Sequence, residues 1–122
     1  FELANAFAEL DYLKACKIVY YFEKNPKMGP LIPVISNLFS YHTKLMRIHF
    51  SKDKSPAALA SVLGVAPFLV AQYTKAAKIY NPKKLAENIA ILQEYDLKSK
   101  GIDNSSSSDG ELMKEMVYRL IN

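Results

Sequence analysis

Between Pro30 and Phe50, apolar residues recur at the spacing of one face of an α-helix. The face consists of Leu31, Val34, Ile35, Leu38, Leu45 and Ile48, and it is widened by Ile32, Phe39, Met46 and Phe50. A stripe with three to four apolar residues in every two turns is typical of a helix that packs one side against a core. We therefore expect one long helix over residues 30–50, central to the fold.

Two prolines mark where later helices begin. Ser55 precedes Pro56, and Asn81 precedes Pro82. In each pair the first side chain can accept a hydrogen bond from a free backbone N–H of the first turn, and the proline presets the backbone for the first helical position. The sequence therefore predicts one helix from Pro56 to Leu63 and another that begins at Pro82. The predicted buried face of the second helix is Leu85, Ile89 and Leu92.

The remaining segments also show helical spacing. Amphipathic stretches cover residues 1–10 and 12–24, and a last one follows Ser108 and Glu111, which have the spacing of a capping box. Residues 101–108 are rich in serine and glycine, so we expect a mobile loop there. No stretch alternates convincingly with a period of two residues. The expected fold class is all-α, a single-domain helical bundle of about six to seven helices.

The composition of the 122 residues fits one globular domain. Half of them are hydrophobic and 23% are charged, which is ordinary for a folded protein. Cys16 is the single cysteine, so an internal disulfide is excluded and a reducing, cytoplasmic location is expected. The sequence shows no secretion leader and no apolar run of membrane length. Because it starts at Phe1, we expect a piece of a longer protein.

Residues 57–76 have the outline of a DNA-binding helix-turn-helix, with two helices that meet near Gly64. A recognition helix presents polar side chains at its N-terminal end, where they bond to base edges. Here that end is Pro67, Phe68, Leu69, Val70 and Ala71. Leaving the large ones in water costs roughly 1.5–3 kcal/mol each, and Gln72 alone nearby has a base-reading side chain. We therefore expect the second helix in the core, with a helix-turn-helix DNA-binding module as the alternative function.

An ordered series of motifs in residues 55–101 resembles the C-terminal domain of the delta subunit of the bacterial clamp loader, which serves the replicative DNA polymerase. The series runs from a Leu-Gly-Val turn and a Pro-Phe pair through an Ala-rich helix and a leucine-spaced helix to Asp, Lys and Gly. Its positions here are Leu63, Gly64, Val65, Pro67, Phe68, Ala76, Ala77, Tyr80, Leu85, Leu92, Asp96, Lys100 and Gly101. The long helix and residues 1–19 are also similar to that family, so the resemblance covers nearly the whole chain.

The resemblance implies a helical C-terminal collar domain over residues 1–122 that holds the loader ring together and has no catalytic role. The implied partners are loader subunits of the gamma/tau and delta-prime types, while the sliding clamp is reached only through an absent N-terminal domain. The connection after the leucine-spaced helix approaches primer-template DNA in that family, which makes Lys98 and Lys100 the DNA-proximal candidates. The subunit-interface candidates are Arg47, Tyr80, Tyr95, Asp96 and Tyr118. For the tyrosines, completion of the domain's own core is the open alternative.

No set of residues predicts an enzyme, a metal site or a cofactor. His42 and His49 are two helical turns apart, about 10.5 Å along the axis, which is too far to share one zinc ion easily. We expect both histidines at the boundary or the surface. Glu94 and Asp96 have no partner acid or histidine for acid–base work, and no glycine-rich phosphate loop occurs.

Charge is the remaining functional signal. Residues 44–84 hold eight Lys and Arg residues against one acid, Asp53, whereas the net charge of the whole chain is only +4. Such a concentration of positive charge attracts DNA phosphates or an acidic neighbouring subunit. A solubilising helix surface is the alternative interpretation.

Overall fold

The computed structural model describes residues 17, 24, 31–101 and 108–121. These residues form five α-helices and a short 3-10 helix, and no strand occurs among them. The elements are α3 (Leu31–Phe50), α4 (Pro56–Leu63), η1 (Pro67–Leu69), α5 (Val70–Ile79), α6 (Pro82–Ser99) and α7 (Asp109–Ile121). The all-α class is thereby confirmed. The helices expected in residues 1–24 lie largely outside the described residues, as does most of the expected mobile loop at 101–108, so the total of six to seven helices stays a prediction.

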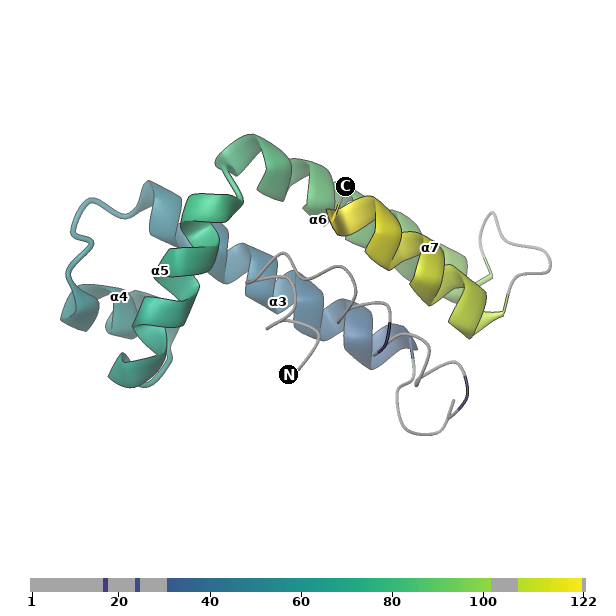
Figure 1. Ribbon diagram of the computed structural model, residues 1–122, viewed down its shortest axis with the longest axis horizontal. Coiled ribbons are helices and arrows are strands. Elements are labelled where there is room, and N and C mark those ends of the chain that lie inside the picture. The colour runs from purple at the N-terminus through teal and green to yellow at the C-terminus, as the bar shows by residue number, and fades with distance from the viewer. Residues whose placement is uncertain (1–16, 18–23, 25–30, 102–107, 122) are drawn as a thin grey trace.

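Helix α3 is the element around which the others are arranged. It contacts α4, α5, α6 and α7, and α6 packs in turn against α7. Figure 1 shows α5 crossing α3 near one end, with α4 beside it, while α6 and α7 lie side by side toward the other end. The predicted long helix is therefore confirmed in its bounds and in its central position.

Local capping explains where the helices begin. The Ser55 hydroxyl accepts a hydrogen bond from a backbone N–H in the first turn of α4 at 3.4 Å, and the Asn81 side chain does the same for α6 at 2.8 Å. Ser108 and Glu111 bond to each other's backbone N–H groups at 3.2 and 3.4 Å, which forms the predicted capping box of α7. The predicted starts of these helices are confirmed.

Helix α4 ends at Gly64, whose φ of 66° lies in the left-handed region that favours glycine. The N–H groups of Gly64 and Val65 both donate to the Ala60 carbonyl, at 3.0 and 3.2 Å. The chain turns by 103° between α4 and the segment Pro67–Ile79. Among the described helices, none is long and apolar enough to cross a membrane alone, and α4 with Pro67–Ile79 reaches that size only as a pair across this bend.

The core contains the predicted face of α3 together with apolar residues from every other described α-helix. Its α3 members are Leu31, Ile35, Leu38, Tyr41, Leu45 and Ile48. The predicted widening of this face is wrong for Ile32, Phe39 and Phe50, which are 50%, 40% and 74% exposed. These three side chains lie beyond the arc of α3 that its neighbours cover.

His42 and Asn88 form the polar centre of the core. Both are fully buried, so the expectation of a boundary or surface position is wrong for His42. The His42 Nδ1–H donates to the Leu38 carbonyl at 2.7 Å, and Nε2 accepts from the Asn88 amide at 3.1 Å. The same amide donates to the Leu120 carbonyl at 3.2 Å, near the end of α7. The bonds join α3, α6 and α7 and require a neutral imidazole with its proton on Nδ1.

Stability is expected to fall in acid because of His42. Burial is the main cause that lowers its pKa below the ordinary 6.5, and the charge of Lys84 adds to it. Below pH 6.5 the unfolded chain binds a proton that the buried ring does not, so the stabilisation is complete above that pH and decreases by up to about 1.4 kcal/mol per pH unit below it. Urea unfolding from pH 7 to pH 5 measures this decrease.

His49→Gln is the matched control, because His49 is only half-buried. The variant keeps His42 as its one histidine and should still lose stability in acid, and nitrogen NMR shifts should report a neutral His42 ring protonated at Nδ1 at pH 6. Stability that stays flat between pH 7 and pH 5 would contradict the prediction.

Candidate functional site

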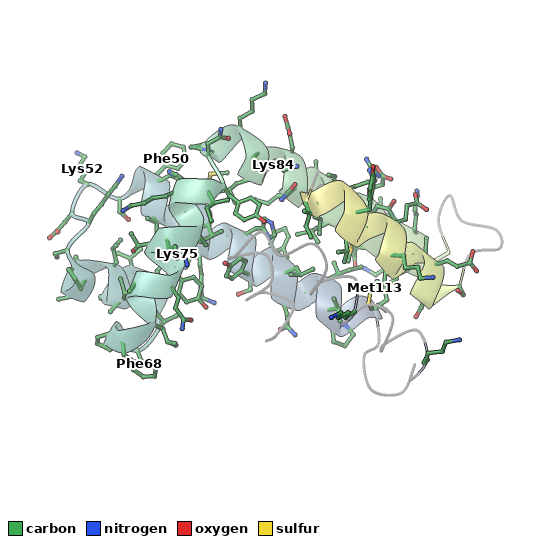
Figure 2. The ribbon with its side chains drawn as sticks, in the orientation of Figure 1. Phe50, Lys52, Phe68, Lys75, Lys84 and Met113 are labelled. Atoms are coloured by element: carbon green, nitrogen blue, oxygen red, sulfur yellow. The ribbon has the colours of Figure 1, made fainter. Side chains whose placement is uncertain are left out.

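The basic residues of the stretch 44–84 form a surface that we call the basic end. It comprises Lys44, Arg47, Lys52, Lys54, Lys75, Lys78, Lys83 and Lys84. Six of them are exposed, and the other two, Lys44 and Lys84, are half-buried. Figure 2 shows Lys52 beyond the end of α3, Lys75 on α5 and Lys84 at the start of α6. One end of the described body therefore gathers cations from three helices and a loop.

Asp53 offsets only one of the eight positive charges of the basic end. Its carboxylate accepts a hydrogen bond from the Ser55 N–H at 2.9 Å, and this bond lowers the pKa of Asp53. Among the described residues, no ion pair involves a cation of the basic end. The positive charge of this surface consequently acts outward, on whatever approaches it.

Large apolar side chains are exposed at the same end. They are Phe68 at 80%, Phe50 at 74%, Val62 at 46% and Ile79 at 37% exposure. The prediction that the start of the second helix is buried is wrong for Pro67, Phe68 and Ala71, which are exposed, although it is confirmed for Val70. The covered face of α5 contains Val70, Ala76 and Ala77. Phe68 is out of phase with that face, and this helical phase is the signal in the sequence that could have identified it.

The outward face of η1 and α5 combines apolar and basic side chains. It consists of Phe68, Ala71, Gln72, Lys75, Lys78 and Ile79, all exposed. Figure 2 shows Phe68 and Phe50 at opposite ends of α5. The face offers aromatic, amide and ammonium groups, which can bind a partner through apolar contact, hydrogen bonds and charge.

A polar network links α6 to α7 at the end of the described body opposite the basic end, which we call the α6–α7 end. The Arg119 guanidinium donates to Glu94 at 2.6 Å and to the Tyr95 hydroxyl at 3.4 Å. The Tyr95 hydroxyl donates to Glu115 at 2.5 Å, and Lys98 lies 3.1 Å from Glu94 and 3.9 Å from Glu115. The Arg119 bond lowers the pKa of Glu94, while burial and then Glu115 raise the pKa of Tyr95 to about 12. These charges serve the contact between the two helices.

The predicted interface tyrosines lie in different environments. Tyr80 and Tyr95 are 2% and 0% exposed, so for these two the alternative holds: they complete the domain's own core. Tyr118 is 57% exposed on α7, and Arg47 is exposed on the basic end. Of the three tyrosines and Arg47, only Tyr118 and Arg47 have exposed side chains that a partner could contact.

The two DNA-proximal candidates are each paired with a carboxylate. Lys98 bonds to Glu94, as described above, and Lys100 lies 3.0 Å from Asp96, the fifth interface candidate. A paired cation attracts phosphate less strongly than one without a counter-charge. The structure therefore brings Lys98, Lys100 and Asp96 to the charge-balanced end and not to the basic end.

The described part of the chain holds no group of three or more His, Cys, Asp or Glu side chains arranged for a metal ion. Comparison with known proteins found no matching family, no similar curated protein and no similar solved structure. The function is therefore argued from the surface itself.

Tyr95→Phe should lower the free energy of unfolding by about 1 kcal/mol, since it removes the hydroxyl that bridges Arg119 and Glu115 but keeps the buried ring. Glu115→Gln retains an acceptor oxygen at the same place and should cost less. Chemical denaturation of both variants beside the wild type gives the comparison, and a Tyr95→Phe protein as stable as the wild type would show that the Tyr95 hydroxyl contributes nothing to stability.

Proposed function

We propose that this chain is the C-terminal collar domain of a bacterial clamp-loader delta subunit, a cytoplasmic, non-catalytic module that packs with other loader subunits. The observation that carries the proposal is the motif series of residues 55–101 together with the helix boundaries. The left-handed Gly64 ends α4 at the position of the family's turn. Tyr80 follows the Ala-rich α5 directly, and Asn81 then caps the leucine-spaced α6.

The exposed surface supports an assembly role. The basic end presents Phe50 in solvent among exposed cations, and the domain's own core does not use this ring. Aromatic residues are enriched at protein interfaces, where burial of their area contributes affinity. The proposed partners are subunits of the gamma/tau and delta-prime types. The domain contacts primer-template DNA without sequence preference. The full-length subunit contacts the sliding clamp through a further domain.

Reconstitution tests the proposal. We expect the chain, and the full-length protein that contains it, to co-elute with gamma/tau and delta-prime subunits in size-exclusion chromatography. An unrelated helical domain of similar net charge is the control for non-specific attraction. The proposal fails if the chain is folded, as judged by circular dichroism, yet associates with none of these subunits either alone or within the full-length protein.

A helix-turn-helix DNA-binding module is the second candidate, because one observation favours it. The 103° bend between α4 and Pro67–Ile79 falls within the range of that motif. The outward face beyond the bend also holds Gln72 and Lys75 in solvent. Gln bonds to adenine in the major groove, and a Phe such as Phe68 contacts the thymine methyl group. Specific hydrogen bonding would rest on Gln72.

Electrophoretic mobility shifts separate the two candidates. The collar domain should bind DNA weakly, with a steep salt dependence and no preferred sequence. A helix-turn-helix module should give a shift for one sequence that persists at physiological salt, and Gln72→Ala should reduce its discrimination by about 1–3 kcal/mol. Asn37→Ala, an exposed amide on α3, is the matched control. A sequence-specific shift abolished by Gln72→Ala alone would replace the collar proposal.

A further inference from the structure

The C-terminal end of α3 lies against the junction between α5 and α6. The His49 ring donates through Nε2 to the Tyr80 carbonyl at 2.8 Å, and Tyr80 directly follows α5. Phe50 follows His49, so this bond holds Phe50 beside the junction, where Figure 2 shows it. We call the surface formed there the Phe50 corner. It consists of Phe50, Ile79, Lys52, Lys78 and Lys83.

The Phe50 corner has an apolar centre and a cationic border. Phe50 is exposed over most of its surface and Ile79 over about a third. The three lysines are all exposed, and two of them flank the buried Tyr80 on either side of the junction. Asp53 is the single acid in residues 44–84, and its carboxylate is bonded to the Ser55 N–H. The corner therefore combines an exposed apolar centre with an excess of positive charge, which the one carboxylate of Asp53 does not balance.

We propose that the Phe50 corner docks an acidic amphipathic segment of a neighbouring loader subunit, a partner whose identity rests on the proposed function. The segment places an apolar side chain against Phe50 and Ile79 and sets carboxylates opposite the three lysines. Burial of the exposed ring supplies affinity, as for aromatic anchors at the centre of an interface. The complementary charges speed the encounter and fix the orientation of the segment.

The chemistry of the corner favours a protein segment over a nucleic-acid strand. Single-stranded nucleic acids bind where several aromatic rings lie in a row, so that successive bases can stack on them. Figure 2 shows the two exposed phenylalanines of the basic end at opposite ends of α5, a helix about 15 Å long for its ten residues. No aromatic side chain lies between them on the outward face. Ile79 directly precedes Tyr80, to which His49 bonds, and adds exposed aliphatic surface at this junction, which an apolar side chain buries but on which a base does not stack.

Two serine variants test the apolar centre. Phe50→Ser and Phe68→Ser are a matched pair, because each removes a largely exposed phenylalanine of the basic end and neither touches the core. In titrations with purified delta-prime and gamma/tau subunits, Phe50→Ser should weaken association by about tenfold or more. Phe68→Ser should leave the affinity within about twofold of the wild type. Circular dichroism and thermal unfolding confirm that both variants are folded.

Two double variants test the cationic border. Lys78→Gln with Lys83→Gln should slow association by about tenfold at low salt and reduce its salt dependence. Lys98→Gln with Lys100→Gln removes the same charge from the end where the lysines are already paired, and should leave the rate near that of the wild type. Primer-template DNA is titrated in parallel with each variant.

The outcomes separate this inference from the function on which it rests. If the wild type associates with the subunits and Phe50→Ser does so equally well, the corner is not the docking surface. If the corner variants lose DNA binding but keep subunit association, the corner is a nucleic-acid site and the inference is overturned. If the wild type itself does not associate, the collar proposal fails first.

Discussion

A run of buried hydrogen bonds holds the three longest described helices in register. It passes from the Leu38 carbonyl through the His42 ring to the Asn88 amide, and on to the Leu120 carbonyl. An imidazole and an amide inside an apolar core are costly unless their polar atoms are paired. Any shift of α6 or α7 along α3 would break the bonds of the Asn88 amide N–H groups, next to the Asn88 Oδ1, which is buried without a partner among the described residues. The positions of the remaining helices, and of the surfaces at both ends, depend on this arrangement.

Charge is used differently at the two ends of the described body. At the α6–α7 end, Arg119 and Lys98 are matched by Glu94 and Glu115, and the Tyr95 hydroxyl links the pairs. At the basic end the cations have no such partners among the described residues, and exposed phenylalanines stand among them. Matched charges hold elements of one domain together, whereas an unmatched surface attracts a separate molecule. The proposed functions therefore rest on the basic end.

The bend at Gly64 is compatible with both subunit assembly and base reading, because a left-handed glycine turn occurs in helical hairpins of both kinds. The side chains beyond the bend carry more information. Phe68 is in solvent, which departs from a purely structural hairpin, yet Gln72 is the only amide on the outward face. One amide and two lysines hold a phosphate backbone or an acidic partner more readily than they distinguish bases.

Helix boundaries followed from the order of amino acids, since caps such as Ser55 and Asn81 act through backbone atoms within one turn. The main apolar face of α3 followed as well, because helical spacing selects it whatever packs there. How far that covered arc extends depends on neighbouring helices, so the exposure of Phe50 emerged only in three dimensions. The same holds for the pairing of His42 with Asn88, which are 46 residues apart. Local rules do not reach across such a separation, and the buried polar centre and the open basic end are both products of long-range packing.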